Sequence, residues 1–132
     1  VPSSEDSQGP GNEIDGWADE MVEHLVKRKR RPPTAVLCWN DDLGVAACSA
    51  LIKHGLRVPQ DVSIIAYDDA SMTQKCQPPL TVVRQPLQAI GKRSANILID
   101  RAEDPKHPDE NVRYTPELVI RESTGPAPKG PD

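Results

Sequence analysis

The sequence contains no phenylalanine, and aromatic residues account for only 3% of its 132 positions. Hydrophobic residues make up 36%, and there are 14 prolines, so the chain cannot build a large aromatic core. Its length allows one domain at most, because domains usually contain roughly 100–200 residues. No apolar run approaches the roughly 20 residues that span a bilayer, and the beginning of the chain lacks the apolar core of a signal peptide. This composition predicts a small soluble protein of a reducing compartment.

The three cysteines, Cys38, Cys48 and Cys76, do not suit a disulfide framework or a structural metal site. They form no CxxC pair, and an odd number is untypical of a secreted disulfide scaffold. The three histidines are scattered and complete no metal-ligand spacing with them. We therefore expect reduced thiols, no bound metal and no cofactor.

The net charge of −4 argues against non-specific binding of nucleic acid by this chain. Both ends are rich in proline, glycine, serine and acidic residues, which cannot bury enough apolar surface to become ordered. We expect residues 1–13 to be disordered or a linker and residues 124–132 to be a flexible tail. The folded part is then residues 14–123.

Between these ends, apolar residues alternate between helical spacing and short β-type runs. The expected elements are a helix (16–29), a strand buried on both faces (34–39), a helix capped by Asn40 that ends at Gly55, a buried strand (62–67), a loop (68–79), a strand (80–84), a helix (87–102) and an extended edge segment (114–123). This order predicts an α/β fold with a parallel sheet flanked by helices.

Polar residues follow the three expected inner strands. Asn40 follows the first, Asp68 and Asp69 follow the second, and Gln85 follows the third. In parallel sheets, ligands bind beyond the carboxyl ends of the strands. A carboxylate accepts strong hydrogen bonds from hydroxyls, and amide side chains both donate and accept, so this set suits a sugar or a similar metabolite. The same residue types also occur there simply as caps and turns, and the sequence leaves both interpretations open.

No catalytic constellation is apparent. Adjacent residues on an extended chain point in opposite directions, so Asp68 and Asp69 are not expected to share one acid–base site. The sequence also lacks the GxSxG, HExxH and phosphate-loop motifs. We expect no catalytic residues and no enzyme activity.

Several long motifs, in order, resemble the LacI/GalR (lac repressor/galactose repressor) family of transcriptional regulators. They are "PTAVLCWND", "GLRVPQDVSIIAYDD", "PPLTVVRQP" and "PELVIREST", and the likeness runs from Pro33 to Thr124. The resemblance implies the C-terminal part of an effector-binding domain with a type I periplasmic-binding-protein-like fold. It also implies ligand contacts by Asn40 and Asp68, with Gln85 near the ligand or the hinge.

The sequence departs from the family pattern at several places. Trp39 stands where a small residue is usual, and it either stacks on a sugar ring or fills the space behind the site. Nothing here corresponds to the family's DNA-binding headpiece, its first lobe, or the opening strand and helix of its second lobe, so we expect a fragment. Helix 87–102 should pack in the absent first lobe of a full-length protein.

The resemblance predicts the effector-binding and dimerisation region of a bacterial, cytoplasmic transcriptional regulator. Its partners would be a small effector, most simply a sugar, a second copy of the chain, and operator DNA through the absent headpiece. No membrane partner is expected. Two alternatives stay open: a periplasmic sugar-binding protein of a transport system, and an enzyme on an α/β scaffold, which the lack of a nucleophile–base pair disfavours.

Overall fold

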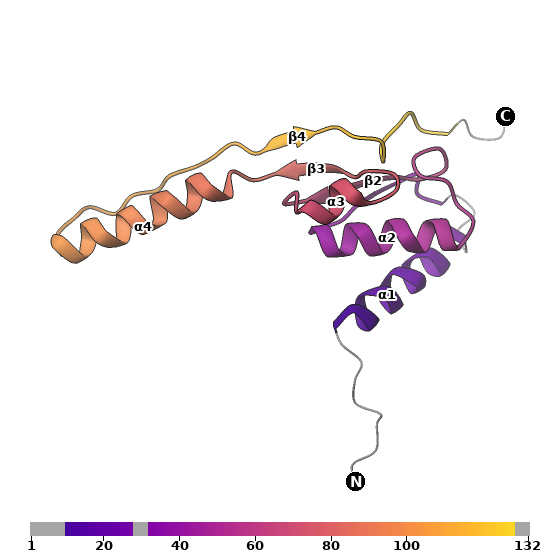
Figure 1. Cartoon of the computed structure of the whole chain (residues 1–132), viewed down its shortest axis with the longest axis horizontal. Coiled ribbons are helices and arrows are strands. Elements are labelled where there is room, and N and C mark those ends of the chain that lie inside the picture. The colour runs from indigo at the N-terminus through magenta and orange to yellow at the C-terminus, as the bar shows by residue number, and fades with distance from the viewer. Residues whose placement is uncertain (1–9, 28–31, 129–132) are drawn as a thin grey trace, which may run out of the picture.

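A computed structural model describes residues 10–27 and 32–128 of the chain (Figure 1). Its elements, in order, are α1 (Pro10–Met21), a π-helical turn η1 (Val22–Lys27), β1 (Ala35–Leu37), α2 (Asp41–Lys53), β2 (Ser63–Tyr67), α3 (Ser71–Lys75), β3 (Thr81–Arg84), α4 (Leu87–Glu103) and β4 (Glu117–Val119). The sheet has the order β1-β2-β3-β4, with β1, β2 and β3 parallel and β4 antiparallel to β3. The predicted α/β class and the edge position of the last segment are confirmed.

The boundaries differ from the expected ones at both ends of the folded part. Residues 10–13, placed in the linker by composition, form the first turn of α1. At the other end, Thr124 bonds through its hydroxyl to Thr81 (2.9 Å), and the Gly125 amide donates to Ser63 Oγ (3.2 Å). Local composition missed Thr124 and Gly125 because long-range hydrogen bonds connect them to the sheet. Residues 1–9 and 129–132 of the expected linker and tail lie outside the described residues.

The core lies between the sheet and one layer of helices. Figure 1 shows α1, α2 and α3 on the same side of the sheet. The side chains of Ile64 and Ala66 on β2 are fully buried against this layer. Gly44 of α2 makes a close approach possible, because a Cβ added there would lie 2.6 Å from the Ala66 Cβ. Burial of this kind contributes roughly 25 cal/mol per Å² of apolar area.

The expectation that the first strand is buried on both faces is wrong for the described residues. β1 lies at the sheet edge and pairs only with β2. Leu37 on β1 is 72% exposed, and Leu118 on β4, which the register places on the same face, is also exposed. The apolar run reads as a doubly buried strand in the sequence, but the described helices cover one face only.

α4 and the segment that follows it project away from the sheet (Figure 1). None of its 17 residues is buried, although Leu87, Leu98 and Ile99 are large and apolar. None of the helices in residues 10–27 and 32–128 is long and apolar enough to cross a membrane. Packing of α4 on a further lobe stays a prediction.

Candidate functional site

Three polar side chains follow the carboxyl ends of the parallel strands. Asn40 follows β1, Asp68 follows β2 and Gln85 follows β3. Because these strands are neighbours and run in the same direction, the three residues line one edge of the sheet in that order. This is the edge at which ligands bind in parallel α/β sheets.

Asp68 and Gln85 are in direct contact. The Gln85 Nε2 group donates to Asp68 Oδ1 over 2.6 Å. Both residues line a hollow of about 480 Å³, together with Asp69, Arg84, Pro86 and the first residues of α4. Among the described residues, no donor contacts the second carboxylate oxygen, Oδ2. Asp68 therefore keeps an acceptor that a ligand hydroxyl can use.

Asn40 is partly committed to the fold. Its Oδ1 accepts from the Leu43 amide (2.9 Å) and thereby caps the N-terminus of α2. This confirms the predicted cap. Among residues 10–27 and 32–128, no acceptor contacts the Nδ2 group, so Asn40 is suited to donate to a ligand rather than to donate and accept equally.

Trp39 lies at the end of β1 and is 79% exposed. It does not line the hollow beside Asp68 and Gln85. Because the Trp39 side chain is so exposed, it does not fill the space behind the site among the described residues. Stacking on a ligand ring stays a prediction.

Asp41 organises the edge, and sequence reasoning saw it only as a first-turn residue. Asp41 is only 5% exposed, and its carboxylate accepts hydrogen bonds from the Asp69 amide (3.2 Å) and from the Ala70 amide. Burial raises the pKa of this carboxyl, and the two amides partly offset that rise. Asp41 thus joins the turn after β1 to the turn after β2.

Asp69 forms the best-connected ion pair near the site. Its carboxylate accepts from the Arg84 Nε group (2.7 Å), from Arg121 (2.6 Å) and from the Thr73 hydroxyl (3.1 Å). Its side chain is 3% exposed. Burial by itself raises the pKa of Asp69, but Arg121 and Arg84 outweigh it and hold the pKa below its usual value. As expected, Asp68 and Asp69 have different partners.

Both aspartates have an unusual backbone conformation. The φ angles of Asp68 and Asp69 are 98° and 74°, in the left-handed region that non-glycine residues rarely adopt. Such residues each cost about 1–3 kcal/mol and persist only where the surroundings enforce them. Here the Asp68 amide donates to the Val83 carbonyl (3.0 Å), while Asp41 and the arginines hold Asp69.

Sequence reasoning missed Arg84 and Arg121 as well as the role of Asp41. One available signal was the placement of each arginine at the end of an apolar β-type run, where a cation needs an acidic partner. Nothing in the sequence indicated that this partner would be Asp69, since it is 15 and 52 residues away from them.

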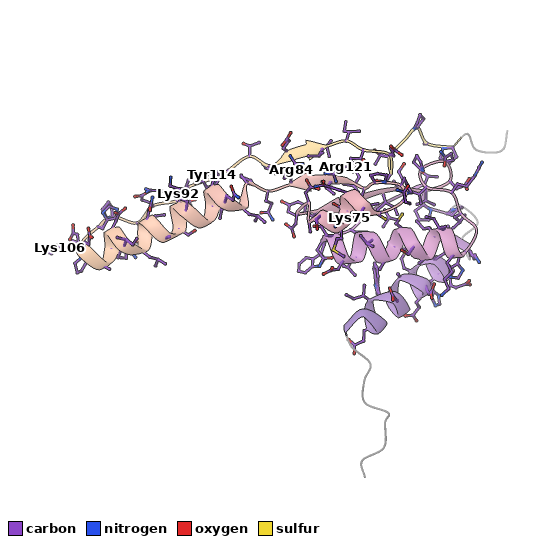
Figure 2. The ribbon with its side chains drawn as sticks, viewed as in Figure 1. Lys75, Arg84, Lys92, Lys106, Tyr114 and Arg121 are labelled. Carbon is purple, nitrogen blue, oxygen red and sulfur yellow. The ribbon has the colours of Figure 1, made fainter. Side chains whose placement is uncertain are left out.

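A group of potential metal ligands lies at the far end of α4, near Lys106 in Figure 2. Ligand atoms of Asp100, His107 and Glu110 lie within 4.8 Å of one another. Glu110 is also held by the Arg93 guanidinium, which already neutralises part of the group. These residues are remote from Asp68 and do not contribute to the site at the strand ends.

A family model for the periplasmic-binding-protein-like domain matches residues 2–124. The chain belongs to this family. The HTH-type transcriptional repressor PurR of Aliivibrio salmonicida is 39% identical over 106 residues, covering 80% of this chain and 32% of the repressor. PurR of Vibrio parahaemolyticus is 36% identical over 121 residues, covering 92% of this chain and 36% of the repressor. The chain therefore spans about a third of the length of these relatives.

Solved structures agree with this assignment. A putative LacI transcriptional regulator from Bacillus cereus matches with a TM-score of 0.78 and 29% identity, over 84% of this chain and 39% of that one. A LacI family regulator from Enterococcus faecium with bound ribose matches with a TM-score of 0.75 and 30% identity, over 88% and 41%. The lac repressor dimer bound to operator and the anti-inducer ONPF matches with a TM-score of 0.72 and 28% identity, over 84% and 37%.

These findings confirm the resemblance to the C-terminal region of LacI/GalR regulators and the type of fold that it implied. The relatives named are repressors, which favours a regulator over a transport protein. These repressors are not enzymes.

Proposed function

We propose that this chain is the effector-binding and dimerisation region of a DNA-binding transcriptional regulator of the bacterial cytoplasm. The observation that carries the proposal is the Asp68 carboxylate, which is fixed by Gln85 through one oxygen and open through the other. It stands at the strand ends where such folds bind ligands.

The chemistry favours a polyhydroxylated effector, most simply a sugar. Asp68 is the main hydroxyl acceptor, Asn40 donates through its Nδ2 group, and Gln85 holds Asp68 while contacting the ligand or the hinge. The exposed ring of Trp39 stacks on the apolar face of a sugar ring. The structural relative with bound ribose supports this class of effector.

The hollow beside Asp68 is open, so we infer that a second lobe closes over it in a longer protein. The exposed apolar side chains of α4 support this, since each fully buried leucine or isoleucine is worth about 1.5–3 kcal/mol. In such a protein the effector shifts the operator affinity of a separate headpiece through its different contacts in two lobe arrangements. This chain alone then binds effector weakly or not at all, and it does not bind DNA.

The test is calorimetric titration of the two-lobed protein with ribose, galactose and lactose, comparing Asp68→Ala with the native protein. Loss of a charge-assisted acceptor should cost about 1.5–3 kcal/mol, which is roughly a ten- to hundredfold loss of affinity. Asp61→Ala is the matched control, because Asp61 is ion-paired with Arg57 on another loop. Unchanged affinity in Asp68→Ala contradicts the site. Failure of every sugar to bind contradicts the effector class.

A further inference from the structure

α4 and the segment that returns from it form a single arm. The Tyr114 hydroxyl donates to the Ala89 carbonyl (3.3 Å), and Arg93 pairs with Glu110. The arm joins the sheet at two places, where β3 leads out into α4 and where the chain returns into β4 (Figure 1). The direction of the arm therefore depends on what fixes these two connections.

The Asp69 carboxylate holds the outgoing connection, and it holds the returning connection through Arg84, which also pairs with Glu117, the first residue of β4. Arg84 is the last residue of β3, and both its Nε and its terminal nitrogen contact Asp69 Oδ2, at 2.7 and 2.6 Å. Arg121 lies beyond β4, at the end of that strand remote from the arm, and contacts the other oxygen, Oδ1, at 2.6 Å. In Figure 2 both arginines lie over the sheet, and Arg84 is the nearer to α4. Asp69 thus bridges the outgoing and the returning strand.

The Asp69 carboxylate is shielded from water, whereas the Arg84 side chain is 43% exposed. The Asp69 side chain is 3% exposed and that of Arg121 is 15% exposed. Two nitrogens of Arg84 contact the same oxygen of Asp69, and hydrogen bonds between charged groups of this kind are stronger than neutral ones. Arg84 extends the connection further by pairing with Glu117 on β4 (3.4 Å).

Asp69 is also rigidly joined to the proposed effector site, because it directly follows Asp68. The turn containing both residues is in the left-handed region, and Asp41 accepts from the Asp69 amide. We propose that Asp69 is a positioning residue that sets the direction of the α4 arm relative to Asp68. It lines the same hollow as Asp68, but its carboxylate is engaged by Arg84 and Arg121. Its link to regulation rests on the proposed function.

Residual dipolar couplings of backbone amides test this in the 132-residue chain itself. In the native chain, one alignment tensor should fit the amides of α2 and α4 together. In Asp69→Asn, we expect α4 to need a separate tensor at least twofold smaller, because the arm reorients freely. The couplings of α2 should stay unchanged, which shows that the sheet and its helices are still folded.

Two matched variants should behave like the native chain. Asp61→Asn breaks a two-pronged aspartate–arginine contact, with Arg57, on a loop that does not hold the arm. Asp68→Asn removes the proposed ligand acceptor but leaves Asp69 paired. A reduced α4 tensor in either variant would contradict a specific role for Asp69.

Arg84→Gln decides the matter if Asp69→Asn does not fold, since Arg121 stays paired with Asp69 in that variant. We expect a partial reduction of the α4 tensor in Arg84→Gln and partial recovery in Arg84→Lys. The inference is overturned if one alignment tensor of native size fits both α2 and α4 in Asp69→Asn. If only Arg84→Gln folds, the same result in that variant overturns it. No ligand is present in this experiment, so its failure is distinct from a failure of the effector site.

Discussion

Gly44→Ala should destabilise the chain strongly, although alanine favours helices. Gly44 lies in α2 facing β2, and an added Cβ would lie 2.6 Å from the Ala66 Cβ and 3.3 Å from Leu80 Cδ1. The Ala66 Cβ cannot rotate away, because it is attached directly to the backbone of a central strand. Either α2 or β2 has to move, and α2 carries Asn40 and Asp41 at its N-terminus.

The magnitude follows from two opposing terms. Overpacking a core by one methyl group costs about 1–3 kcal/mol, and a contact this short belongs at the upper end. Replacing glycine by alanine within a helix returns about 0.5–1 kcal/mol. The net loss is therefore about 2 kcal/mol, or on the order of 10 °C in Tm for a domain of this size.

The assay is urea unfolding followed by circular dichroism, with Gly16→Ala as the matched control. Gly16 lies in α1 and has nothing within 4 Å of its added Cβ, so this variant should gain about 0.5–1 kcal/mol. If Gly44→Ala is as stable as Gly16→Ala, α2 does not approach β2 this closely. The close packing of α2 on β2 would then not be what positions the turn after β1.

Three further predictions concern pH, thiols and association. Arg57 lowers the pKa of Asp61 to about 2, and Arg121 and Arg84 lower that of Asp69 against the effect of burial. The stabilisation by these two ion pairs is present above the unfolded pKa of about 4 and is lost as the pH falls towards about 2. The urea midpoint should therefore decrease between pH 4 and about 2, and it should decrease less in Asp61→Asn. A urea midpoint that does not change with pH in the native chain contradicts this. Burial raises the pKa of Cys38 to about 11 and that of Cys48 to about 12, so a thiol reagent at pH 8 should modify the less buried Cys76 first. After denaturation without reductant, the reagent should modify all three thiols. Modification of fewer than three would indicate an oxidised pair. The apolar residues of α4 favour self-association, so light scattering should show a dimer at high concentration, whereas a monomer throughout, with α4 amides protected from exchange, would contradict this.

The order of elements was predictable because the signals are local. The β-type runs and the helical spacing identified β2, β3 and α4 to within one residue, and Asn40 and Gly55 marked both ends of α2. What failed depends on tertiary context. β1 is exposed because the described helices cover only one face of the sheet. The short helix α3 was expected to be loop because its sequence is polar and has no apolar periodicity.

The placement of the candidate residues at the strand ends was predictable, but their connections were not. Asn40, Asp68 and Gln85 follow the parallel strands as expected, and their contact with a ligand stays a prediction. The roles of Asp41 and Asp69 depend on pairings across as many as 52 residues of sequence. Such pairings leave no periodic pattern, so only the fold could show them.

A crystal structure of the two-lobed protein with its bound sugar would show directly whether Asp68 binds the effector. We expect an Asp68 carboxylate oxygen at about 2.6–3.2 Å from a sugar hydroxyl, with Gln85 still donating to Asp68 and Asn40 Nδ2 facing the ligand. A sugar bound elsewhere, with Asp68 contacting only Gln85, would contradict it.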